Sequence, residues 1–218
     1  VSIHKQFDFL ISLINDSGTC ISPIFLLSDS TYTAAFFSNF LISCSNKLSN
    51  FFCVGWLAQK FPLLIRDISE HGHSIASHSF YHQPVSDLGS EAFYEDALRS
   101  KETIQEVTGK PVLGYRAPGY SITSIMPWAL DCLLNAGYKY DSSLLHVRTP
   151  TVLANGLVEI PPNSIRILNS FYPINGGTVF RFLPYPLYAI YISMLERLDR
   201  PLIFYTHTWE IYPTKIKV

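Results

Sequence analysis

The sequence predicts an α/β fold in which parallel strands alternate with helices. From residue 51 onward, short apolar runs that suit buried strands alternate with longer segments in which apolar residues recur at helical spacing. Gly and Pro residues stand at the borders between these segments, where helices begin and end. Such an alternation is typical of a parallel sheet covered by helices.

Several helices are placed by the residues at their borders. Pro62 and Pro127 suit the first turns of two helices, and Ser90 is a candidate N-cap for the longest one. Gly109 and Gly137 follow two of the predicted helix ends. The predicted elements are, in order, strand 51–54, helix 62–70, strand 73–77, helix 90–107, strand 112–115, helix 127–136, strand 138–141, strand 158–160, helix 186–198 and strand 202–205.

The composition supports one globular domain over residues 1–218. Hydrophobic residues make up 48% of the 218 residues, which is enough for one sizeable core and excludes intrinsic disorder. The formal net charge is -1, so no basic field exists to attract nucleic acid, and we expect no nucleic-acid partner.

Residues 9–54 differ from the rest of the chain. They contain only three charged side chains, Asp16, Asp29 and Lys47, and no sustained helical or strand period, so no element is predicted there. The longest uncharged run, residues 30–46, is rich in Ser, Thr and Asn, and we therefore expect no integral membrane segment. No signal-peptide pattern opens the chain, and the sequence leaves the localisation undetermined.

Four of the seven histidines lie within residues 71–82. His78 and His82 are four positions apart, so their imidazoles can converge on one metal ion on a helical turn or in a tight loop. They follow a short apolar strand, and the carboxyl ends of strands are where α/β folds place their sites. For His71 and His73, hydrogen-bonded or exposed side chains without a ligand role are the expected state.

Four motifs in order resemble the polysaccharide deacetylases, the NodB-homology group of carbohydrate esterase family four. The segment GHSIASHSFYH at 72–82 is similar to the family's second motif, which supplies two metal ligands. GYRAPGY at 114–120, YDSS at 140–143 and IFYTH at 203–207 are similar to the later motifs. Three further segments resemble the branch found with exopolysaccharide loci: FFCVGW at 51–56, VEIPP at 158–162 and HTWE at 207–210.

The resemblance covers residues 51–213 and implies a distorted (β/α) barrel, incomplete at its N-terminal edge. It also implies a hydrolase that removes N-acetyl groups from a polysaccharide with a divalent metal, usually zinc. His78 and His82 would bind the metal, and Arg116 would orient the catalytic carboxylate. The backbone N–H near Tyr120 would help to hold the oxyanion. His207 would protonate the leaving amine, with Asp141 tuning its pKa.

Each of these residues also has an ordinary structural explanation when taken alone. Arg116 could form a surface salt bridge, Asp141 could be a turn or cap residue, and Tyr120 could pack in the core. His207 follows an apolar run and is placed at a strand end.

The family's first motif, a pair of aspartates that supplies the catalytic base and the third metal ligand, has no match here. Asp8 lies at about the expected distance from His78, but the residues around it do not fit the motif. Residues 1–50 are therefore expected to be divergent or damaged, and the chain to be impaired or inactive. Two alternatives stay open: an allantoinase-like hydrolase of cyclic amides, and a non-catalytic saccharide- or metal-binding remnant.

Overall fold

The computed structural model describes residues 20–25, 49–182, 184–197 and 203–207. It is a mixed α/β fold with one large sheet, as the alternation of elements predicts. Seven strands of this sheet run parallel, and β6 joins its edge antiparallel to β7. The strands of the sheet, in spatial order, are β10 (Ile203–His207), β1 (Cys20–Phe25), β2 (Asn50–Cys53), β3 (Ser74–Ser77), β4 (Gly114–Tyr115), β5 (Tyr140–Asp141), β7 (Val158–Glu159) and β6 (Thr151–Val152).

The strand order is that of a β/α barrel, because the last strand returns to pair with the first. Within the described ranges no ladder joins β7 to β10, so the ring is open on that side. Asn163 bridges the opening: its backbone carbonyl accepts the N–H of Ile174 at 2.9 Å, and its Oδ1 accepts the Nδ2–H of Asn175 at 2.8 Å and the N–H of Ile203 at 2.7 Å. Two of these three hydrogen bonds use the Asn163 side chain, and an isolated parallel bridge between Gly176 and Tyr205 adds a backbone connection to β10.

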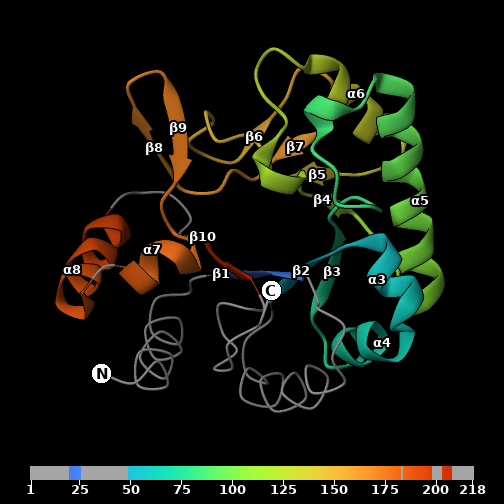
Figure 1. The fold of residues 1–218 in the computed structure, drawn as a ribbon, viewed down its shortest axis with the longest axis horizontal. Coiled ribbons are helices and arrows are strands. Elements are labelled where there is room, and N and C mark those ends of the chain that lie inside the picture. Colours follow the sequence, from blue (N-terminus) through green and yellow to red (C-terminus); the bar gives the residue numbers. More distant parts are fainter. Residues whose placement is uncertain (1–19, 26–48, 183, 198–202, 208–218) are drawn as a thin grey trace.

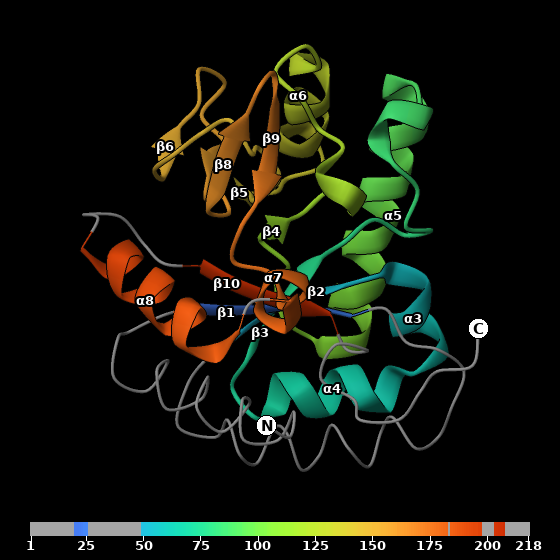
Figure 2. The ribbon, with the colours of Figure 1, turned by 60° about the vertical axis from the view of Figure 1, so that its left-hand side comes forward.

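The helices cover the outer side of the strands. In Figure 1, α3, α4 and α5 lie together on the right, and α8 lies on the left. Figure 2 shows the same separation from a second direction. Among the described residues, no helix is long and apolar enough to cross a bilayer. The helices are α3 (Gly55–Lys60), α4 (Pro62–Glu70), α5 (Ser90–Thr108), α6 (Pro127–Asn135), α7 (Gly177–Phe182) and α8 (Tyr185–Glu196), with one-turn 3-10 helices η1 (Val85–Asp87) and η2 (Pro118–Tyr120).

Most predicted helices are found within two residues of their predicted bounds. One correction concerns α5: its N-cap is Gly89, and Ser90 is already helical, with no side-chain cap bond. No pattern predicted β1, α3, α7, or the antiparallel hairpin of β8 (Ser164–Ile167) and β9 (Ser170–Pro173). Because β1 lies between β10 and β2, the first-strand position that we expected to be incomplete is occupied.

The two faces of the sheet carry different side chains. We call the side packed against the helices the outer face; it carries Phe51, Cys53 and Tyr115, which join the main core with Phe93 and Ile104 of α5. The opposite, inner face carries a small cluster in which Phe52, Ala76 and Tyr205 pack with Tyr120 and Tyr140. Successive residues of a strand point to opposite faces of the sheet. The register between strands therefore determines which polar side chains reach the inner face and which reach the outer face.

Candidate metal and catalytic site

His78 directly follows β3 and is 2% exposed. Its backbone N–H donates to the carbonyl of Cys53 at 2.8 Å, which continues the β2–β3 pairing. Its Nδ1 lies 2.6 Å from the carbonyl oxygen of Arg116. Because a carbonyl can only accept, Nδ1 must carry the hydrogen, and Nε2 keeps its lone pair. A metal-binding histidine is normally held in place by a hydrogen bond of this kind from its other ring nitrogen.

His82 is brought to His78 by a tight loop rather than by a helical turn. The centroids of the two imidazole rings lie 5.0 Å apart. Ser79 and His82 both have positive φ angles, 68° and 58°, which side-chain-bearing residues seldom adopt. The Ser79 Oγ accepts the His82 backbone N–H at 3.0 Å and helps to hold this conformation.

Asp96 of α5 fixes the same loop from outside. Its Oδ2 accepts the N–H of Phe80 at 2.9 Å, and its Oδ1 accepts the N–H of Tyr81 at 3.2 Å. Sequence reasoning missed this residue. The available signal was an aspartate on the buried face of a helix, between Phe93 and Ala97, where a charge needs a specific partner.

His207 ends β10 on the inner face, where its ring lies 6.1 Å from that of Tyr205. Burial lowers the pKa of His82, and the nearby charge of His207 lowers it further. Burial also holds the pKa of His78 well below its usual range, with His82 adding to the effect. The structure therefore brings three histidines to one region, and it favours neutral His78 and His82, the form in which imidazole binds metals.

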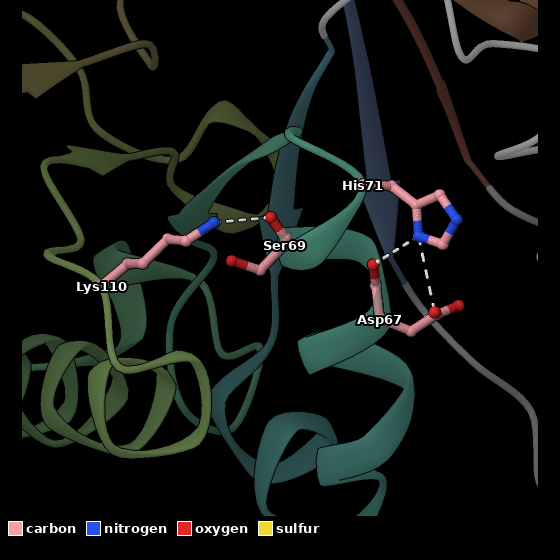
Figure 3. A network of polar contacts seen from close by, with 4 residues as sticks. All are labelled: Asp67, Ser69, His71 and Lys110. Atoms are coloured by element: carbon pink, nitrogen blue, oxygen red, sulfur yellow. Dashed lines mark hydrogen bonds and ion pairs between the residues drawn. The ribbon is translucent and has the colours of Figure 1, made fainter.

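His71 and His73 lie at the other end of β3 and take no part in this cluster. Figure 3 shows the His71 ring turned towards Asp67, whose backbone oxygen is 2.8 Å from Nδ1. Lys110 donates from the same region to the Ser69 carbonyl at 2.6 Å. His73 is buried, and its Nδ1 accepts the N–H of Ser49.

Arg116 follows β4 and is 1% exposed, so it does not form a surface salt bridge. Its Nε donates to the Ser142 carbonyl at 3.1 Å and its Nη2 to the Ser142 Oγ at 2.6 Å. The guanidinium carbon lies 4.1 Å from the ring centroid of Phe52, which stacks below it. Nη1 is buried and meets no acceptor in the described part of the chain, so it is a donor available to a carboxylate at the site.

Tyr120 ends the short η2 turn next to Arg116. Its φ is 55°, and its ring packs against that of Tyr205 at a centroid distance of 5.7 Å. Its backbone N–H, which the resemblance assigns to the oxyanion, donates to the Ala117 carbonyl at 3.1 Å. In this conformation the ring contributes to the inner cluster and the N–H closes the turn.

Asp141 points to the outer face. It is paired in register with Tyr115, which lies in the outer core, and with Glu159. Its Oδ1 accepts the hydroxyl of Ser143 at 2.7 Å and its Oδ2 accepts the N–H of Ser143 at 3.2 Å. Among the residues that the structure describes, its contacts are with the chain that follows it and with Glu159, and they do not include His207.

A third metal ligand does not come from the described residues. No group of three or more His, Cys, Asp or Glu side chains within them is arranged to hold an ion. Asp8, the candidate from sequence, lies outside the described residues. The donor set that fits a metal here is the pair His78 and His82.

Comparisons with known proteins agree with the motifs. A profile described as polysaccharide deacetylase matches residues 46–140, and a profile described as a domain of unknown function (DUF3473) matches residues 124–218. A peptidoglycan deacetylase from Helicobacter pylori is 30% identical over 98 residues, which make up 45% of this chain and 32% of that protein. The chain spans about a third of the length of the curated relatives it matches.

Solved structures share the fold. A protein from Mycobacterium smegmatis described as a polysaccharide deacetylase superposes with a TM-score of 0.63 at 22% identity, covering 89% of this chain and 78% of that one. An allantoinase superposes with a TM-score of 0.60 at 15% identity, covering 88% and 78%. The profile match, the sequence relatives and this shared fold together support a polysaccharide deacetylase domain of the NodB type over residues 46–140.

Proposed function

We propose that this domain hydrolyses the N-acetyl groups of a polysaccharide, with a divalent metal, expected to be zinc, held by His78 and His82. The observation that carries the proposal is the fixed tautomer of His78. Its Nδ1–H is committed to the Arg116 carbonyl, so its Nε2 lone pair is available beside His82. When bound, such an ion supplies an activated water and polarises the acetamide carbonyl.

Amide hydrolysis also needs a general acid and a correctly oriented base, and two further inner-face residues fit these roles. His207 would donate a proton to the leaving amine nitrogen, because histidine is the side chain that most often acts as general acid. Arg116 would present Nη1–H to a carboxylate that acts as base, because its Nε and Nη2 atoms already donate to Ser142. The relatives named peptidoglycan deacetylases suggest a polymer that contains N-acetylglucosamine as the substrate.

We also propose that catalysis by this chain is impaired. The base and third ligand belong to an aspartate motif that the sequence lacks, and no acidic side chain completes the histidine pair within the described ranges. Two protein ligands make a weaker site than the three that catalytic zinc normally has.

The test measures acetate release from N-acetylglucosamine oligomers and bound zinc per chain, for the parent protein, His78→Ala and His71→Ala. His71 is the matched control, because it belongs to the same histidine cluster but lies at the opposite end of β3. Acetate release that is lost in H78A and kept in H71A supports the deacetylase and overturns the impairment. Zinc below one ion per chain with no release supports impairment.

A cyclic-amide substrate is the second candidate, because the allantoinase shares the fold. Ring opening of allantoin by the parent protein, without acetate release from the oligomers, would favour it over the deacetylase. Zinc-independent saccharide binding without either reaction would identify a non-catalytic remnant.

A further inference from the structure

Two acidic residues lie next to each other on the outer face, where the proposed chemistry does not take place. Asp141 of β5 and Glu159 of β7 are partners in the parallel register, so their side chains leave the sheet side by side. Both residues are 0% exposed. Two ionised carboxylates cannot be buried together without a large cost, so this pair needs an explanation.

The hydrogen bonds around the pair show what is missing. Glu159 Oε1 accepts the N–H of Leu144 at 3.0 Å, whereas Glu159 Oε2 meets no donor among the described residues. The group beside it is the Asp141 carboxyl, which lies within hydrogen-bonding reach. A carboxylate has no hydrogen to give, so the contact becomes a hydrogen bond only if one of the two groups is protonated.

We propose that Asp141 and Glu159 share one proton and act together as positioning residues for Arg116. The proton resides mainly on Glu159, which donates to the Asp141 carboxylate. Like charges at close range favour a single shared proton over two charges, as in other carboxyl pairs.

The surrounding charges agree with this assignment. Burial, followed by the neighbouring Asp141, raises the pKa of Glu159 to about 10, and Arg116 opposes this shift. Burial raises the pKa of Asp141 to about 6, although the Ser143 hydroxyl stabilises its charged form. Burial, with the charge of Asp96 next in size and a smaller effect of Asp141, keeps the pKa of Tyr115 well above its usual range, so the Tyr115 hydroxyl stays neutral.

The pair reaches Arg116 through the turn that connects them. Asp141 holds the hydroxyl of Ser143, and that hydroxyl oxygen accepts the N–H of Ala117 at 2.8 Å, next to Arg116. Glu159 holds the N–H of Leu144 at the other end of the turn. Ser142 directly precedes these two anchored residues and binds the guanidinium with its carbonyl and its hydroxyl. Asp141 and Glu159 therefore fix the turn that binds Arg116, and among the described residues neither carboxyl group is hydrogen-bonded to the guanidinium itself.

The positioning role rests on the proposed deacetylase activity, whereas the shared proton does not. Glu159→Gln is the informative variant, because the amide can donate to Asp141 and still accept from Leu144. Glu159→Ala removes both bonds. Glu106→Gln, on the exposed side of α5, is the matched control.

The first measurement is the infrared C=O band of a protonated carboxyl group at about neutral pH, where an isolated carboxyl is ionised. We expect the band in the parent protein and in E106Q, and its loss in E159Q. Absence of the band in the parent protein, or its persistence in E159Q, would overturn the shared proton whatever the activity.

The second measurement tests positioning through turnover and through amide exchange. We expect E159A to lower kcat about 10²-fold with little change in KM, while E159Q stays within about threefold of the parent. If the chain releases no acetate, the Ala117 amide reports the same role: its protection from hydrogen exchange falls in E159A and is kept in E159Q. Equal behaviour of E159A and E159Q in exchange and turnover would contradict positioning.

Discussion

The two faces of the large sheet use the same strands for different purposes. The outer face packs Phe51, Cys53 and Tyr115 against the helices in a continuous apolar core. The inner face has a much smaller apolar cluster, and it carries Arg116 and His207, with His78 at the end of β3. Because side chains alternate along a strand, neighbouring residues such as Tyr115 and Arg116 serve opposite faces.

This difference suggests that substitutions on the two faces of the sheet have different effects, one mainly on the stability of the fold and the other mainly on the proposed site. An outer-face substitution should change the free energy of unfolding and leave the site intact, whereas substitution of a site histidine on the inner face should mainly change the site. Asp96 and the Asp141–Glu159 pair are the exceptions, because they lie on the outer side and support loops that carry inner-face residues.

Phe93→Ala tests the outer face and has the largest expected effect. Phe93 is 0% exposed and packs edge-on against Tyr115 and Trp128, with ring centroids 5.7 and 6.0 Å away. Truncation should lower the free energy of unfolding by about 3–5 kcal/mol, because it leaves a cavity. Urea denaturation measures this. Leu63→Ala, at an exposed helix position, is the control and should have little effect. If the folded fraction of F93A loses zinc binding, the two faces are not separable.

Asp96→Ala tests the connection between the faces. It leaves the N–H groups of Phe80 and Tyr81 without their acceptor, and the expected loss of stability is about 1–3 kcal/mol. Unlike Phe93→Ala, it should also weaken zinc binding, because the loop that carries His82 loses its anchor. Calorimetric titration of zinc measures this effect. Glu95→Ala, the exposed neighbour on α5, should match the parent in both measurements.

Gly114→Ala tests how closely the inner face is packed. A Cβ at this position would lie 2.0 Å from the Tyr140 ring, so the ring must move. We expect a loss of about 1–3 kcal/mol in unfolding free energy, typical of overpacking. In Gly89→Ala the new Cβ meets nothing within 4 Å, which makes it the control for thermal unfolding. Equal melting temperatures for the two variants would show that Tyr140 is loosely held.

The sequence predicted the helices, strands and motifs better than it predicted which face of the sheet each side chain lies on. The strand and helix alternation and four motifs placed His78, Arg116 and His207 at strand ends and His82 shortly after the strand that precedes His78, where the structure has them. Strands β4, β5 and β7 are only two residues long, too short to show a period of two. The outward direction of Asp141 is set by register with neighbouring strands, and no local pattern reports it.

Elements that depend on distant partners were also missed. β1 lies in the segment that is poor in charge and has no period, and it is defined by pairing with β10 and β2. Glu159 appeared in the sequence only as part of an apolar strand before two prolines. Its significance arises from Asp141, its partner in the next strand, which is 18 positions earlier in the chain.

The pH dependence of stability is the smallest predicted effect when it is expressed per pH unit, and it tests the acidic exception on the outer face. In the unfolded chain Asp and Glu ionise near pH 4. In the folded protein burial and Asp141 raise the pKa of Glu159 to about 10. Between these values the folded state holds a proton that the unfolded state has released. Raising the pH through this window therefore lowers the free energy of unfolding, by at most about 1.4 kcal/mol per pH unit.

Glu159→Gln replaces the titrating carboxyl group by an amide that does not titrate. The unfolding free energy of this variant should therefore fall less steeply with pH than that of the parent between about pH 6 and pH 9. Urea denaturation at several pH values gives both slopes. The comparison must be between variant and parent, because burial lowers the pKa of His78 and makes stability rise with pH near and below the usual histidine range. That contribution is common to both proteins and cancels in the difference. Equal slopes of unfolding free energy against pH in the parent and in E159Q would mean that Glu159 is ionised in the folded state. The outer face would then hold two buried charges beside the turn that binds Arg116.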